Sequence, residues 1–128
     1  MKLLLDTHSF LWFITGDQQL TARAQSHIED PAHQSYVSAA SLWEIAIKVG
    51  LGKLTLTEPF ATLIPRELEA NAMTLLPVRV EHLARLIELP FRHRDPFDRL
   101  LAAQALVDDF TVVSKDGVLD AYGVRRVW

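Results

Sequence analysis

Four acidic residues lie beside segments that resemble strands or helix starts, and their side chains suit the binding of a divalent cation. They follow or lie within the stretches KLLL, AASLWEIAIKVG, HRDPFDRLLAAQA and FTVVS, as Asp6, Glu44, Asp98 and Asp116 respectively. Mg²⁺ prefers oxygen ligands and keeps several waters, so a few protein carboxylates are enough to hold it. Gathered in one place, these acids would form a cation site able to act on phosphate esters.

The apolar pattern predicts alternating strands and helices that would bring these acids together. We expect strands at residues 2–5, 35–38, 73–78, 110–114 and 124–128. We expect helices at residues 9–14, 21–30, 39–50, 80–89 and 96–108, a short helix at 117–122, and a helix between residues 58 and 71 that Pro65 interrupts or delays. This alternation indicates an α/β fold with a mainly parallel sheet and helices on both faces. In such a sheet the carboxyl ends of the strands share one edge, where ligands bind.

Each of these acids also has a local explanation. Asp6 is of a residue type preferred at helix N-caps, and Asp116 forms an Asp-Gly pair that is typical of turns. Glu44 lies four residues before Lys48, which is the spacing of a helical ion pair. The rest of that helix is largely apolar, so its narrow polar stripe faces either water or a cleft.

The stretch HRDPFD contains two aspartates around a predicted helix start. Pro96 fits the first helical position, which makes Asp95 the N-cap and Asp98 the third helical residue. The pair then resembles a capping box in which Asp replaces Glu. Capping explains Asp95 fully but Asp98 only in part, because its shorter side chain reaches the cap N–H less easily.

Length and composition limit what the protein can be. The 128 residues fit one domain, which we expect to span residues 1–128, and 49% of them are apolar. The absence of cysteine excludes disulfides and thiolate metal sites. The net charge of −3 argues against a broad basic surface for nucleic acid, although not against phosphate binding through metal ions. Polar residues interrupt the first apolar run too early for a signal peptide or a membrane span, so we expect a cytoplasmic protein.

Four blocks of sequence, taken in order, resemble the PIN-domain ribonucleases and more narrowly the VapC-type toxins of bacterial toxin–antitoxin pairs. The blocks are LLLDTHSFLW, SAASLWEIAIKVGLGKL, HRDPFDRLLAAQA and VVSKDGVLDAYGVRRVW. The resemblance covers nearly the whole chain and implies a three-layer α/β/α sandwich around a central, mainly parallel sheet of about five strands. It also implies an acidic pocket that binds Mg²⁺ or Mn²⁺ and an endoribonuclease activity that hydrolyses RNA phosphodiester bonds.

The resemblance also assigns residues and partners. Matched block by block, it implies that four acids are catalytic and bind metal: Asp6, Glu44, Asp98 and Asp116. Asp95 and Ser114 are likewise expected to be accessory to the site. Independently of the resemblance, Arg99 is expected to be a further accessory residue, because it is adjacent to Asp98 and a guanidinium suits contact with a phosphate. By the same resemblance we expect a homodimer, and a cognate VapB-type antitoxin whose C-terminal segment covers the active groove, so that a larger complex forms.

The chemistry of such a cluster leads to two further expectations. Like charges close together raise one another's pKa, so we expect the metal-free site to bind protons partly in place of metal. We expect Asp6, Asp98 and Asp116 to hold metal directly, and Glu44 directly or through water. The five histidines show no zinc-binding spacing, and His8 is the one we single out for its closeness to Asp6.

Two other classes of protein compete with this interpretation. A Mg²⁺-dependent phosphoryl-transfer or receiver-like domain would also gather acids at strand ends. It fits less well, since the first strand ends in a single acid and no GxxxxGK[ST] loop is present. A catalytically silent PIN-like module that binds RNA or protein is the other alternative, and the presence of all four acids argues against it.

Overall fold

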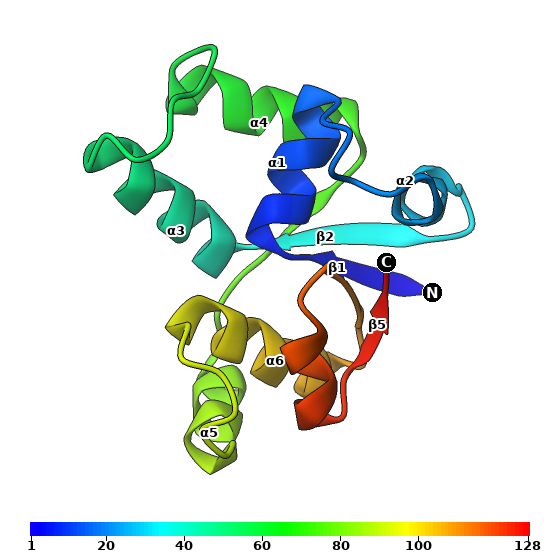
Figure 1. The fold of residues 1–128 in the computed structure, drawn as a ribbon, viewed down its shortest axis with the longest axis vertical. Helices are drawn as coiled ribbons and strands as arrows, with labels where there is room; N and C mark the ends of the chain where they lie inside the picture. The colour runs from blue at the N-terminus through cyan, green and yellow to red at the C-terminus, as the bar shows by residue number, and fades with distance from the viewer.

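Five parallel strands form the central sheet in a computed structural model that describes residues 1–128 (Figure 1). The strands are β1 (Lys2–Leu5), β2 (Gln34–Ser38), β3 (Thr74–Leu76), β4 (Thr111–Val113) and β5 (Arg125–Val127). Their order in the sheet is β3-β2-β1-β4-β5, and every neighbouring pair is parallel. The predicted parallel sheet of about five strands is therefore confirmed.

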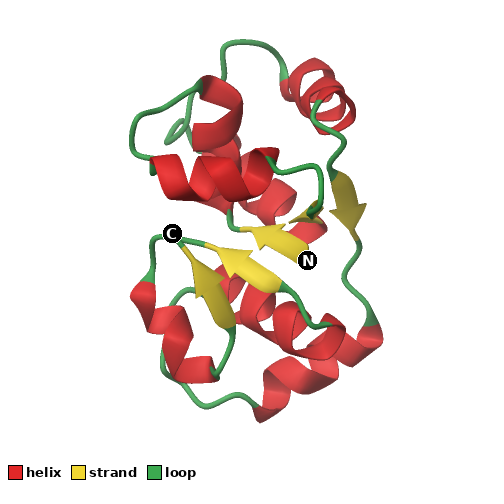
Figure 2. Ribbon diagram, turned by 90° about the vertical axis from the view of Figure 1, so that its right-hand side faces the viewer, coloured by secondary structure: helices red, strands yellow, loops and turns green.

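Helices cover both faces of this sheet, as the view in Figure 2 shows. The first group is α1 (Thr7–Thr15), α2 (Ala22–Glu29), α3 (Ala39–Gly50) and α4 (Phe60–Ala70). The second group is α5 (Val80–Glu88), α6 (Pro96–Asp108) and the short 3-10 helix η1 (Gly117–Tyr122). The fold is thus the three-layer α/β/α sandwich that the sequence resemblance implied.

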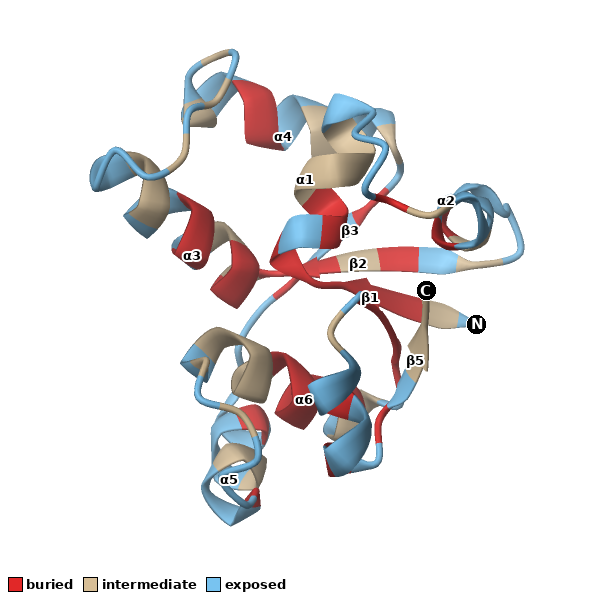
Figure 3. Cartoon of the chain, viewed as in Figure 1, coloured by how far each residue is buried: buried red, intermediate tan, exposed pale blue.

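The residues of β1 show how the two helical layers are held to the sheet. Leu3 and Leu5 point to one face and pack with Phe10 and other residues of the first helical group, whereas Leu4 points to the opposite face and packs with Leu101 and its neighbours in α6. Side chains alternate in this way along any strand, so a strand buried on both sides is apolar throughout. Figure 3 shows the result, with the buried residues concentrated in the sheet and on the inner sides of the helices.

The prediction that Pro65 interrupts or delays its helix is wrong. Helix α4 begins at Phe60 and continues through Pro65 to Ala70. Proline has no N–H, so the carbonyl of Ala61 loses its usual helical partner. Both Ala61 and Pro65 are exposed, and water can therefore satisfy that carbonyl without breaking the helix.

The chain order places a change of direction between β1 and β4. From β1 the chain adds β2 and β3 on one side of the sheet, and then returns to place β4 and β5 on the other side. Ligands of open α/β sheets bind at such a point, beyond the carboxyl ends of the strands. Asp6 directly follows β1 and Asp116 lies three residues after β4, so the topology brings both to this point.

None of the helices has the combination of length and apolar character required to span a membrane.

Candidate metal-binding site

Acidic side chains gather in a pocket of about 390 Å³ at the carboxyl edge of the sheet. Eight residues line it: Asp6, His8, Trp12, His93, Asp95, Asp98, Lys115 and Asp116. They come from the N-cap and body of α1, from the first turn of α6 and the segment that leads into it, and from the loop after β4. Three of the four acids singled out by spacing therefore meet in one cavity, together with the expected accessory residue Asp95.

Asp6 and Asp116 occupy the pocket and cap helices at the same time. The Asp6 side chain accepts the Ser9 N–H at 2.8 Å at the start of α1. The Asp116 side chain accepts the Val118 N–H at 3.0 Å at the start of η1. In each case the cap uses Oδ1 and not Oδ2, so Oδ2 can bind a cation. Each aspartate can therefore cap its helix and belong to the cation site at the same time.

At the start of α6 the two aspartates divide their roles. Asp95 Oδ1 accepts the Phe97 N–H at 2.8 Å and the Asp98 N–H at 3.3 Å, so Asp95 is the N-cap. The expected capping box is wrong in its second half, because the Asp95 N–H donates to His93 Nδ1 at 3.1 Å instead of to Asp98. The Asp98 carboxylate is thereby left to face the pocket.

This division predicts contrasting results for substitutions at Asp95. Asp95→Asn should keep cation binding and stability close to wild type, because asparagine caps helices as well as aspartate does. Asp95→Ala should lower the free energy of unfolding by about 1 kcal/mol through loss of the cap. Denaturant unfolding and calorimetric Mg²⁺ titration measure both. A loss of cation binding in Asp95→Asn as deep as that in Asp98→Asn would contradict the division.

Glu44 lies behind the pocket wall rather than in its lining. Its residue is only 5% exposed, and its two carboxylate oxygens are both engaged. The Thr7 hydroxyl donates to Oε1 at 2.6 Å, and Lys48 Nζ lies 2.7 Å from Oε2. The Glu44–Lys48 ion pair suggested by the spacing therefore exists. Its carboxylate, however, is buried beside the site and does not face the solvent.

The cluster raises the pKa of Asp98 to about 7. The largest cause is burial of the carboxyl, followed by the nearby charges of Asp95 and Asp6, while His93 acts in the opposite direction. Among the ion pairs of the protein, the pocket carboxylates have only His93 as a partner, through Asp98 and Asp116. No lysine or arginine forms an ion pair with these oxygens, so they remain free to bind a divalent cation such as Mg²⁺.

The raised pKa predicts that cation binding releases protons in mildly acidic solution. At pH 6 the free Asp98 carboxyl is mainly protonated, and a carboxylate ligand must be ionised, so binding should release close to one proton. At pH 8 the carboxyl is already ionised, and little release is expected. Calorimetric titration of Mg²⁺ in buffers of different ionisation enthalpy measures the number of protons. Equal release at both pH values would contradict the assignment of the raised pKa to Asp98.

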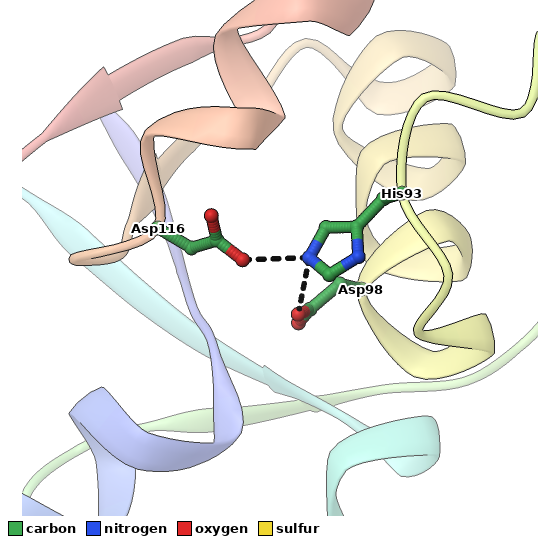
Figure 4. A group of neighbouring side chains, drawn as sticks. All are labelled: His93, Asp98 and Asp116. Carbon is green, nitrogen blue, oxygen red and sulfur yellow. Dashed lines mark hydrogen bonds and ion pairs between the residues drawn. The ribbon is translucent and has the colours of Figure 1, made fainter.

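His93 is a pocket residue that the sequence interpretation missed. Its Nε2 lies 2.6 Å from Asp116 Oδ2 and 3.1 Å from Asp98 Oδ2, as Figure 4 shows. The nitrogen and the carboxylate oxygens of these three residues all lie within 4.8 Å of one another. Its position in the sequence could have indicated this, because His93 lies two residues before the N-cap Asp95. Residues that lead into a helix lie close to the side chains at the N-terminus of that helix. We had singled out His8, which lines the pocket wall and lies beside Trp12 with 5.5 Å between ring centroids.

The other two expected accessory residues lie outside the pocket lining. Ser114 is buried, and its hydroxyl oxygen accepts the Asp116 N–H at 3.0 Å, so it holds the loop that carries Asp116. Arg99 turns away from the acids: its Nη2 donates to the Leu89 carbonyl at 3.1 Å, and its guanidinium lies over the Phe91 ring. Arg99 is thus engaged with the segment before α6, and the structure does not support the expected phosphate contact.

The fold and the pocket together define an α/β/α protein with a carboxylate site at the switch point of a parallel sheet. Comparison with known families agrees, because residues 3–124 match the sequence profile of the PIN domain. The chain belongs to the PIN domain family. No curated protein sequence matches it significantly.

Solved structures share this fold at low sequence identity. The chain is similar to a chain in the VapBC2 complex of Rickettsia felis bound to a promoter DNA fragment, with a TM-score of 0.74, 14% identity, and coverage of 99% of this chain and 98% of that one. For VapBC-1 of nontypeable Haemophilus influenzae the TM-score is 0.68, with 13% identity and coverage of 99% and 97%. For FitAcB of Neisseria gonorrhoeae it is 0.62, with 20% identity and coverage of 98% and 96%. At these identities the likeness shows the fold.

Proposed function

We propose that this protein is a Mg²⁺- or Mn²⁺-dependent endoribonuclease, and that it is the toxin of a VapBC-type toxin–antitoxin pair acting on RNA in the cytoplasm. The observation that carries the proposal is the meeting of Asp6, Asp98 and Asp116 in one pocket of a PIN-domain fold, without a lysine or arginine paired to them. Clustered carboxylates are suited to a divalent cation, and nucleases use such cations on phosphodiesters.

In this proposal each residue around the pocket has a separate role. Asp6, Asp98 and Asp116 hold the cation, and Glu44 adds negative charge behind them. When bound, the cation would polarise the phosphate and lower the pKa of an attacking water. Lys115, which is exposed at the pocket, is placed to contact a phosphate oxygen of the RNA.

The partners of this proposal rest on the family and on surface features. A groove of about 490 Å³ shares His8 and Trp12 with the acidic pocket and runs between α1, the segment 54–58 and α4. It gives a segment of an antitoxin a place to lie next to the active site. Trp43 of α3 and Leu51, which follows the end of α3, are 62% and 64% exposed, which is consistent with a homodimer whose subunits bury them. The solved structures named above include complexes of related folds with their partners.

The alternative function is a PIN-like module that binds RNA or protein without cleaving it. The pocket favours the enzyme, because a silent module has no need to keep several carboxylates together against their mutual repulsion. A single experiment separates the two: purified protein is incubated with a mixture of structured RNAs and Mg²⁺ or Mn²⁺, with a chelator and Asp98→Asn as controls. Metal-dependent cleavage that Asp98→Asn removes supports the enzyme. RNA binding with no cleavage under any of these conditions supports the silent module.

A further inference from the structure

The backbone around His93 is held by hydrogen bonds from η1. The Tyr122 hydroxyl oxygen accepts the N–H of Arg92 at 3.1 Å and the N–H of His93 at 2.9 Å. These residues lie in the segment between α5 and α6 that has no regular secondary structure of its own. The position of the His93 ring therefore follows from contacts with a separate element and not from chance orientation of a loop.

The bonds on the two ring nitrogens assign the tautomer of His93. The Asp95 N–H donates to Nδ1 at 3.1 Å, so Nδ1 carries a lone pair and the proton of the neutral ring is on Nε2. Nε2–H then donates to Asp116 Oδ2 at 2.6 Å and faces Asp98 Oδ2 at 3.1 Å. The hydrogen-bond pattern is consistent throughout, since each contact joins one donor to one acceptor.

This tautomer argues against the two usual roles of a histidine in a nuclease site. Nε2 cannot ligate a cation while it carries the proton. Moving the proton to Nδ1 would turn Nδ1 into a donor that faces the Asp95 N–H, which is also a donor, and the hydrogen bond between them would be lost. A neutral ring is also a poor proton donor to a leaving oxygen, because loss of the Nε2 proton would leave an imidazolate. What remains is a fixed N–H donor on Nε2 that lies against two carboxylates.

We propose that His93 is a positioning residue that hydrogen-bonds Asp116 and holds it beside Asp98 when no cation is bound, and that a cation must displace this hydrogen bond to occupy the site. The inference rests on the proposed function only in taking these carboxylates as cation ligands. In Figure 4 the ring lies between the two carboxylates, so it occupies space beside the oxygens that would hold a cation. His93 thus limits repulsion in the free site and competes with the cation for one oxygen of each aspartate.

The wild-type protein itself provides the first test. Long-range ¹H–¹⁵N correlation spectra of histidine-labelled protein distinguish a protonated Nε2 from a protonated Nδ1, and the spectrum of His93→Gln assigns the signals of His93 among the five histidines. Without metal at pH 8 we expect the tautomer with the proton on Nε2. A proton on Nδ1 would overturn the proposal, whatever happens to any variant.

The second test is the affinity for Mn²⁺ and Mg²⁺ at pH 8, measured by calorimetry. His93→Leu removes the donor and should tighten binding of both ions by about tenfold, the equivalent of one hydrogen bond to a charged group. His93→Gln can place an amide N–H near the position of Nε2 and should stay within about threefold of wild type. His27→Leu, which alters a histidine outside the acidic pocket, is the matched control.

The direction of the change decides between the roles. Weaker Mn²⁺ binding in His93→Leu, with ¹⁴N coupling to Mn²⁺ in the pulsed electron paramagnetic resonance spectrum of the wild type, would show that His93 is a ligand and would overturn the proposal. Unchanged affinity would overturn it as well. Circular dichroism and thermal unfolding of His93→Leu verify that it is folded before titration. None of these measurements uses RNA. Absence of RNA cleavage would therefore count against the proposed function, whereas the role of His93 is decided by the tautomer and by the cation affinities.

Discussion

Asp98→Asn is expected to lower metal-dependent RNA cleavage by roughly 10²–10³-fold while making the metal-free protein more stable at pH 8. The loss of activity follows from removal of a charged ligand at the reacting phosphate, an effect comparable with loss of one donor that stabilises a transition state. The gain in stability follows from the position of the carboxyl. Asp98 is largely buried among Asp95, Asp6 and Glu44, which raises its pKa to about 7 from an ordinary value of 3.8.

The sign of the stability effect depends on pH. Between pH 3.8 and about 7 the folded protein holds a proton on Asp98 that the unfolded chain has lost, so stability falls as the pH rises through this window. Above about pH 7 the buried carboxyl is ionised in the folded protein, and the folded state loses at most about 4 kcal/mol of stability for a pKa shift of this size. We expect Asp98→Asn to recover roughly 1–3 kcal/mol at pH 8 and little at pH 4, since solvent and relaxation reduce the ceiling.

Urea unfolding of both proteins in chelator at pH 4, 6 and 8 measures this dependence, and an RNA cleavage assay measures the activity. Asp109→Asn is a suitable control, because its carboxylate is largely exposed and outside the pocket. A variant that is inactive and also less stable than wild type at pH 8 would show that Asp98 has a structural role that outweighs the cost of its charge.

Replacing Asp6 separates its charge from its cap and is the second change for which we expect a large effect. Asp6→Asn keeps an oxygen for the Ser9 N–H, so the start of α1 should be preserved and the free energy of unfolding should change by less than about 1 kcal/mol. It removes one negative charge from the cation site, and cleavage should fall by about 10²-fold or more.

Asp6→Ala removes both the charge and the cap, so it should be as inactive as Asp6→Asn but less stable by about 1 kcal/mol. Thermal unfolding, Mg²⁺ titration and RNA cleavage, measured together on the two variants, test the separation. Asp17→Asn controls for a general effect of charge, because Asp17 is exposed and does not line the acidic pocket. Cleavage retained by Asp6→Asn would mean that Asp6 serves only as a cap.

The order of strands and helices could be predicted because their sequences carry strong periodic signals. Three consecutive leucines, residues 3–5, form the buried part of β1, Gly16 ends α1 with a left-handed backbone, and Pro96 opens α6. Placement of Asp6 and Asp116 at one edge then follows from the parallel arrangement alone. Local physics was sufficient here because each of these signals lies within a few residues of the element that it defines.

Side-chain contacts between distant segments could not be predicted in the same way. The spacing of Glu44 and Lys48 indicated an ion pair but not that Thr7, from a different helix, would bind the other oxygen. Arg99 is adjacent to Asp98 in a place where phosphate contact was plausible, and yet it lies against Phe91. His93 contacts Asp116 across 23 residues of chain, a partnership with no periodic signature.

The pairing of β1 with β4 has a consequence for the synthesis of the protein. Leu3 lies opposite Thr111, so β1 gains this neighbour only after more than a hundred further residues have been translated. Asp116 arrives later still, and the Tyr122 hydroxyl that holds the His93 segment comes after it. A nascent chain therefore lacks an assembled carboxylate pocket until the segment that carries Asp116 and Tyr122 has been translated, so any activity of this site has to wait for that segment.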